Sequence, residues 1–254
     1  MLQDVLQADV FAFFLVFARM GAAVMLMPGL GESYVSARIR LMIALAIALV
    51  VTPVVSDTLP PQPDSPAALV LLMGGEVMVG LFLGMVARIV FNALQTAGMI
   101  IAYQTGMANA FIADPTAAVQ GALFGVFLGV LGILIIFETG LHQLLLSAVI
   151  DSYHVFVPGH LPPLDDFSRV VARVVADSFD LSVRMAAPFL VVALVFYLGL
   201  GLLGRLMPQI QVFFIALPLQ VVLGLVVLML TIIAIMNWFA GAYENTISTA
   251  LMGR

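Results

Sequence analysis

The stretch Leu206–Tyr243, LMPQIQVFFIALPLQVVLGLVVLMLTIIAIMNWFAGAY, decides the fold, because its 38 residues carry no charge. As one helix rising 1.5 Å per residue, it would be about 57 Å long, nearly twice the thickness of the bilayer hydrocarbon. Tilt accommodates such an excess poorly, so the helix should break or protrude from the bilayer. Pro208 and Pro218 are the expected break points. We predict an irregular element at 205–218 and a spanning helix at 219–240.

The composition of the whole chain is also that of an integral membrane protein. Hydrophobic residues make up 63% of its 254 residues and charged residues 9%, whereas a soluble domain has about 45–50% and 25%. The mean hydropathy is +1.20. The chain has no lysine and no cysteine, and its formal charge is −5. A soluble globule and a disordered chain are poor fits to this composition. A nucleic-acid binder is a poor fit as well, because phosphate backbones require clustered basic residues.

The rest of the chain contains five further apolar runs that could span a bilayer. They are Val10–Met27, Ile39–Val55, Ala67–Val90 (which could continue toward Tyr103), Gly121–Phe137 and Leu181–Leu203. Asp4 and Asp9, rather than basic residues, precede the first run, so we expect a retained span and no cleaved signal. The fold class is therefore an all-α integral membrane protein with about six hydrophobic helices and breaks between them.

The segments between these runs indicate boundaries and orientation. The prolines of residues 57–66 predict a loop, and the Val pairs mixed with charges in Phe167–Phe179 indicate an interfacial helix. Arg38 and Arg40 place the first loop in the cytoplasm and the amino terminus outside. Arg205 agrees with that orientation, whereas the two arginines at 169 and 173 disagree with it.

Four charged residues interrupt the apolar runs: Arg19, Glu76, Arg88 and Arg184. Each is costly in lipid and should face protein or water. One interpretation is an ion or proton path, which normally requires several carboxylates or histidines in series. The interpretation that we favour is packing, with an internal ion pair between Glu76 and either Arg19 or Arg184.

No motif in the sequence predicts an enzyme. It has no hydrolase elbow, no phosphate-binding glycine loop and no His-Glu metal helix. His142, His154 and His160 lie near several acids, but their spacing matches no tight ligand pattern. We expect no catalytic residue, no metal site and no cofactor.

The segment Gln104–Gln120 is irregular although long apolar helices flank it. Non-helical backbone at membrane depth is tolerated only where protein buries it or where it lines a cavity. The segment could therefore occlude a pore, or it could be a surface connection. Two glycine stripes, Gly80-x-x-x-Gly84 and the series Gly121, Gly125 and Gly129, allow close helix packing within the chain or against other subunits.

Two stretches point to a family. LQTAGMIIAYQTGMANAFIADP at Leu94–Pro115 and GLGLLGRLMPQIQVFFIALPLQ at Gly199–Gln220 resemble the FliR family of flagellar export-gate proteins and its injectisome relatives. The resemblance extends over the whole chain in length and helix order. Its most specific residues are Arg205, Pro208, Gln209 and Pro218. The chain departs from the family at Ala216, where the family often has Gly, and at Gln220, where it often has a basic residue.

The resemblance implies a fold and a role. One copy of the chain would join several copies of two other small membrane protein families in a helical, cone-like gate in the bacterial inner membrane, at the flagellar basal body. Unfolded flagellar proteins would pass through its centre, and further export-apparatus proteins would be partners. The implied fold is a single export-gate domain of two helix-hairpin modules, at about 1–137 and 138–254.

The resemblance also implies that residues Gly106–Gln120 form a plug inside the closed channel. The plug residues carried over are Gly106, Met107, Asn109, Phe111, Ile112, Asp114 and Pro115. Met107, Phe111 and Ile112 would occlude the channel, because apolar contacts without directional bonds can seal it and re-form around varied sequences. The alternatives to a flagellar gate are an injectisome gate, a gradient-driven small-solute transporter and a structural scaffold.

Overall fold

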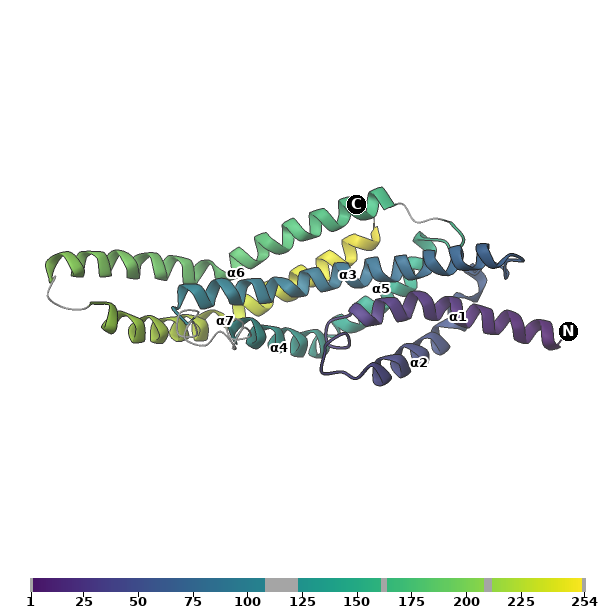
Figure 1. Cartoon of the computed structure of the whole chain (residues 1–254), viewed down its shortest axis with the longest axis horizontal. Coiled ribbons are helices and arrows are strands. Elements are labelled where there is room, and N and C mark those ends of the chain that lie inside the picture. Colours follow the sequence, from purple (N-terminus) through teal and green to yellow (C-terminus); the bar gives the residue numbers. More distant parts are fainter. Residues whose placement is uncertain (1, 108–122, 161–163, 208–211, 253–254) are drawn as a thin grey trace. The chain divides into compact units, whose positions relative to one another are not determined.

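The structure, a computed structural model, describes residues 2–107, 123–160, 164–207 and 212–252, and the regular elements in these ranges are all helices joined by turns and loops (Figure 1). The elements in chain order are α1 (Leu2–Leu26), α2 (Ala37–Val55), the 3-10 turn η1 (Ser56–Thr58), α3 (Pro66–Gln104), α4 (Leu123–Glu138), α5 (Leu141–Val155), α6 (Leu164–Leu206) and α7 (Val212–Met252). The predicted all-α class is confirmed, as is the continuation of the third run to residue 104.

The number of hydrophobic helices also agrees with the prediction. Among the described residues, five helices are long and apolar enough to cross a membrane, and a sixth candidate is formed by α4 and α5 together. These two helices meet at a bend of 68°. Gly140 lies at the bend with φ +75°, a backbone conformation that costs glycine little. The described residues therefore contain five candidate spans, or six if the bent pair is counted as one.

The predicted interfacial helix at Phe167–Phe179 is not a separate element. It is continuous with the fifth apolar run in α6, which has 43 residues. No glycine or proline occurs between Leu164 and Pro188, so nothing in the backbone ends the helix at the change from charged to apolar sequence. Ion pairs between Asp165 and Arg169 and between Asp180 and Arg184, each four residues apart, lie on its charged half.

The predicted extent of the last helix is also wrong. Helix α7 begins at Val212 instead of residue 219, contains Pro218, and continues to Met252, while Arg205 belongs to α6. Pro218 removes one N–H from the hydrogen-bond ladder of α7, and the helix continues through it. The polar residues after Tyr243 contain no breaker until the end of α7, so the loss of hydropathy does not end the helix.

The helices form two compact units that alternate along the chain. The first contains residues within Met1–Val90, Phe137–Val175 and Tyr243–Arg254, and the second contains residues within Phe91–Ile136 and Ala176–Ala242. Helices α3, α6 and α7 each contribute to both units. The division into successive modules near residue 137 concerns the assembled gate and stays a prediction.

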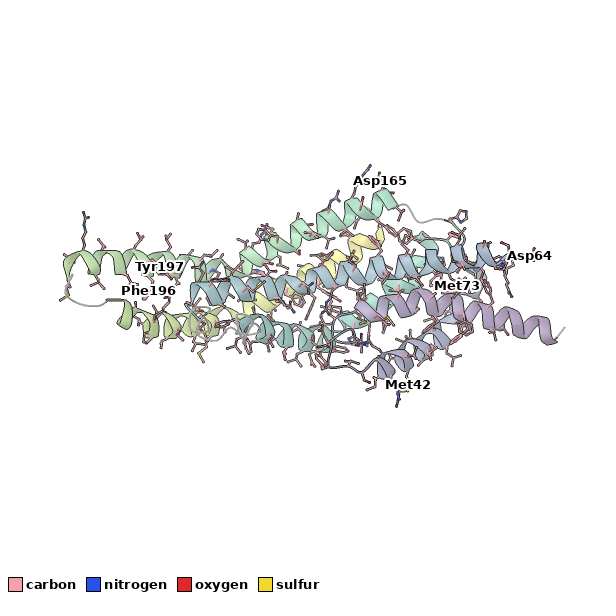
Figure 2. All side chains as sticks on the ribbon, viewed as in Figure 1. Met42, Asp64, Met73, Asp165, Phe196 and Tyr197 are labelled. Carbon is pink, nitrogen blue, oxygen red and sulfur yellow. The ribbon has the colours of Figure 1, made fainter. Side chains whose placement is uncertain are left out.

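In the first unit, α1 and α2 form an antiparallel hairpin (Figure 1). Met42 on α2 projects away from α1 (Figure 2) and is 55% exposed. Helix α3 packs closely on α1, because Gly80 and Gly84 face the backbone oxygens of Arg19 and Ala23. The first glycine stripe therefore packs within the chain.

An aromatic cluster adds to the core of the first unit. The rings of Phe82 on α3 and Phe167 on α6 stack with centroids 3.9 Å apart. Phe156, which follows α5, meets both rings edge to face. Such pairs stabilise a core beyond the burial of their apolar area.

In the second unit, α3 is the central element. Gly98 on α3 lies directly against the backbone of Gly125 on α4, and Gly132 packs beneath Leu94. Phe91 on α3 meets Phe239 on α7 edge to face, with centroids 6.3 Å apart. The described part of the second glycine stripe thus also packs inside the chain, where the absence of side chains lets the helices approach.

Candidate functional site

Arg19 on α1 is the most buried charge of the first unit, at 1% exposed. Its Nε donates to Glu76 Oε2 on α3 at 2.7 Å, and its Nη2 donates to Glu76 Oε1 at 3.0 Å. This bidentate geometry is the strongest arrangement for an arginine and a carboxylate. Of the two arginines considered as partners of Glu76, the structure pairs Arg19.

The rest of the Arg19 guanidinium is also satisfied, by residues of α5 and its end. Nη1 donates to Ser152 Oγ at 3.0 Å, and Nη2 donates to the carbonyl oxygen of Phe156 at 2.8 Å. The Arg19 Cζ lies 3.9 Å from the centroid of the Tyr153 ring, a cation–π contact. We call Arg19, Glu76, Ser152 and Tyr153 the buried charge cluster; it ties α1, α3 and α5 together.

The other two intramembrane charges predicted to pack are less buried. Arg88 on α3 forms an ion pair with Glu32, in the turn between α1 and α2, and both side chains are partly exposed. Arg184 pairs with Asp180 on its own helix at 2.7 Å, and its side chain is 71% exposed. Arg184 therefore differs from Arg19, because it lies at the boundary of the charged half of α6.

A cavity of about 330 Å³ borders Glu76 in the first unit. Apolar residues of the proline-rich loop and of the first turns of α3 line most of it, and the titratable groups in its wall are Glu76 and His160. Both carboxylate oxygens of Glu76 accept hydrogen bonds from Arg19. This arrangement favours packing over proton transfer. Across the described ranges, no group of three or more His, Asp or Glu side chains could hold a metal ion.

The segment predicted as a plug starts at the carboxyl end of α3, in the second unit. Thr105 and Gly106 are buried, and Gly106 has φ +71°. The Thr105 N–H donates to the carbonyl oxygen of Ile101 at 2.9 Å, and the Gly106 N–H donates to that of Tyr103 at 3.3 Å. The backbone thus closes one last turn at Gly106 and leaves the helix there.

Only part of the predicted site falls on residues that the structure describes. Gly106 and the half-buried Met107 are described, while Asn109, Phe111, Ile112, Asp114 and Pro115 lie outside the described residues. Of the family-motif residues, Arg205 is exposed at the end of α6 and Pro218 is exposed inside α7. The other two, Pro208 and Gln209, are outside the described ranges.

The sequence analysis did not predict the contacts of four residues at these sites: Glu32, Ser152, Tyr197 and Gln220. Gln220 on α7 donates to the carbonyl oxygen of Gln104 at 2.6 Å and to the Tyr197 hydroxyl at 3.0 Å. The sequence does contain a signal for Gln220, which is an amide inside an uncharged apolar run, because a buried amide must find hydrogen-bond partners. Ser152 and Tyr197 give no comparable signal.

Much apolar surface of the second unit is uncovered within the chain. Only 17% of the most apolar window of α6 is buried, and 22% of that of α7. The exposed side chains on these helices include Val191, Leu194, Val195, Leu198, Leu202, Val222, Leu225, Val226, Met229, Leu230 and Ile233. Lipid or other protein must cover a surface of this size.

The chain is similar to known proteins over most of its length. Residues 10–246 match the model of the family described as bacterial export proteins, family 1. The chain is 41% identical over 237 residues to the flagellar biosynthetic protein FliR of Caulobacter vibrioides, covering 93% of this chain and 94% of that one. It is 29% identical over 241 residues to FliR of Bacillus subtilis, covering 94% and 92%. It is 30% identical to the Yop proteins translocation protein T of Yersinia pestis, covering 87% and 85%.

Proposed function

This chain belongs to the bacterial export proteins, family 1, and from that premise we propose that it is a core subunit of the flagellar type III export gate. It is a membrane protein of a flagellar export family and not of a known enzyme family. With partner subunits it forms the channel through which unfolded flagellar proteins cross the inner membrane. The observation that carries the proposal is the similarity to flagellar FliR over nearly the whole chain.

The proposed partners are two other small export-gate membrane protein families, and one copy of this chain joins several copies of theirs. The uncovered apolar surfaces of α6 and α7 support an assembly of this kind. Neighbouring helices can bury such surfaces as well as lipid can. We place the complex in the inner membrane, at the flagellar basal body.

A flagellar role is favoured over an injectisome role. The identity to flagellar FliR of Caulobacter vibrioides exceeds the identity to the Yersinia translocation protein T. The family match also speaks against a gradient-driven transporter of small solutes.

We also propose that residues Gly106–Gln120 are the plug of the closed channel. The described support is the end of α3 at Gln104, where Gly106 turns the backbone out of the helix. Met107, Phe111 and Ile112 are the proposed occluding residues. Their apolar contacts seal against ions and yield to a passing chain.

The first test is a clean deletion in the native host. Filament protein in the medium and swimming in soft agar are measured with and without a plasmid that carries the gene. Loss of both, restored by the plasmid, is the expected result. Normal swimming and normal filament export in the deletion strain would remove the flagellar role.

The plug requires a second test, in which residues 108–116 are deleted and the ion conductance of the membrane is measured. Export should continue while conductance rises. Asp64→Ala, in the proline-rich loop of the first unit, is the matched control and should leave conductance unchanged. A deletion variant that reaches the membrane at normal levels and conducts no more than the wild type would refute the plug.

A further inference from the structure

Gln220 holds the carboxyl end of α3 through hydrogen bonds of its side-chain amide. It lies on α7 and is 6% exposed. Its Nε2 donates one hydrogen bond to the carbonyl oxygen of Gln104, at 2.6 Å, and another to the Tyr197 hydroxyl, at 3.0 Å. Tyr197 lies on the carboxyl-terminal half of α6 (Figure 2). Three helices of the second unit thus meet at one amide group.

The bond to Gln104 satisfies a group that a helix cannot satisfy by itself. The last carbonyl oxygens of an α-helix have no partner within the helix. The Gln220 amide supplies a donor for the carbonyl of the last residue of α3. Both Nε2 hydrogens are used, so the amide is oriented by its two acceptors.

The two residues that follow Gln104 are held by α7 as well. A Cβ at Gly106 would lie 3.2 Å from Gln220 Oε1, and a Cβ at Gly224 would overlap the Thr105 side chain. Three consecutive residues of the chain, Gln104 to Gly106, therefore contact α7. This is the point at which the chain leaves α3.

We propose that Gln220, together with Tyr197, is a positioning residue that clamps the end of α3 and so sets the place and direction from which the following segment departs. We call Gln220, Tyr197 and the Gln104 carbonyl the α3 clamp. The consequence for a plug rests on the proposed function; the clamp itself does not. The essential chemistry is donation of hydrogen bonds, so a donor at position 220 preserves the clamp and an apolar or acceptor-only side chain loses it.

A disulfide test measures the clamp directly, because the chain contains no cysteine. Thr105 Cβ lies 2.8 Å from the position of a Cβ at Gly224, so the pair Thr105→Cys and Gly224→Cys needs a shift of about 1 Å to reach disulfide geometry. The change at Thr105 also removes the methyl group that would overlap. The matched control is Leu26→Cys with Gly84→Cys in the first unit, where the Cβ separation is 2.9 Å. Both pairs are oxidised in membranes from the native host, and the rate of disulfide formation is measured.

The measurement is then repeated with three substitutions of Gln220. Gln220→Leu removes both donors, and Gln220→Glu places an acceptor against the Gln104 carbonyl. We expect Gln220→Leu, which loses both hydrogen bonds, to slow the Thr105–Gly224 disulfide about tenfold or more. Gln220→Glu loses the bond to the Gln104 carbonyl and should slow the disulfide as well, although its carboxylate can still accept from the Tyr197 hydroxyl. Gln220→Lys should restore the rate, because an ammonium group donates to both acceptors and is favoured at a helix carboxyl end. The control pair should form at one rate throughout, which shows that the first unit is folded in each variant.

Several results would overturn the clamp. They are the absence of the Thr105–Gly224 disulfide where the control pair forms, an equal rate with Gln220→Leu, and a slow rate with Gln220→Lys as well. Ion conductance is measured on the same variants beside the deletion of 108–116. If that deletion does not conduct, the plug fails while the disulfide rates still decide the clamp. If the deletion conducts and Gln220→Leu slows the disulfide, Gln220→Leu should raise conductance and Gln220→Lys should not.

Discussion

Replacing Glu76 by Gln should destabilise the protein strongly, because Arg19 then loses its counter-charge in a site where it is 1% exposed. The amide keeps the shape of the carboxylate but offers one acceptor instead of two. In the wild type, two N–H groups of Arg19 donate to Glu76 at 2.7 and 3.0 Å. In the variant, the NH2 group of the amide faces one of these N–H groups and cannot accept its hydrogen bond. Removing one partner of a buried ion pair costs about 3–5 kcal/mol. That is a large part of a total folding stability of about 5–15 kcal/mol.

The assay is thermal unfolding of the full chain, purified in detergent from the native host with any subunits that accompany it. For a chain of this size each kcal/mol shifts the Tm by roughly 2–4 °C, so the expected loss is about 6–20 °C. The matched control is Arg184→Gln, which breaks an ion pair whose Arg184 side chain is 71% exposed. An exposed pair contributes about 0.3–0.5 kcal/mol, so the control should change the Tm by no more than about 2 °C.

A double substitution separates charge from shape. Arg19→Met with Glu76→Leu removes both charges and leaves apolar side chains of similar volume, which is often neutral for a buried pair. The carbonyl oxygen of Phe156 then loses its donor, which costs about 1–3 kcal/mol. The double variant should therefore have a higher Tm than Glu76→Gln. The reasoning is refuted if Glu76→Gln changes the Tm no more than Arg184→Gln does. A normal Tm with a loss of export would instead support the proton path.

Two further predictions concern the first unit. Gly80→Ala should lower the Tm, because a Cβ there would overlap the Arg19 carbonyl oxygen and overpacking costs about 1–3 kcal/mol. The control is Gly74→Ala on the same helix, where a Cβ would meet nothing within 4 Å; it should raise stability by up to about 1 kcal/mol. Equal Tm values for the two variants would contradict the packing of α3 on α1. Tyr153→Phe should leave the Tm unchanged or raise it. The Tyr153 hydroxyl is buried without a hydrogen-bond partner among the described residues, and the phenylalanine ring would keep the contact with Arg19. A fall in Tm of several degrees would show that the hydroxyl has a partner.

The apolar extent of the helices could be predicted from the sequence, whereas the ends of α6 and α7 could not. Hydropathy is a sum over local residues, and it identified the spans and the extension of α3. A helix end depends instead on caps and on breakers that are strong enough to stop it. Pro218 is near the amino end of α7 and does not stop the helix, and the charged half of α6 has no breaker at all.

The sequence predicted that Glu76 of the buried charge cluster is paired with an arginine, but it did not predict which one. An arginine and a glutamate in apolar runs must be paired, but the choice between Arg19 and Arg184 depends on tertiary packing. The presence of Asp180 four residues before Arg184 was the relevant clue. Such i, i+4 pairs form on one helix without any tertiary contact.

The two polar sites hold their helices by bonds of different strength, and this difference predicts which contact breaks more easily. The Arg19 site combines an ion pair with hydrogen bonds to Ser152 and the Phe156 carbonyl, and breaking it costs several kcal/mol. The α3 clamp consists of two neutral hydrogen bonds, each of which contributes about 0.5–1.5 kcal/mol. A conformational change during transport requires two states separated by only a few kcal/mol. We therefore expect the Arg19 site to hold α1, α3 and α5 together throughout, and the α3 clamp to be the contact that breaks more easily.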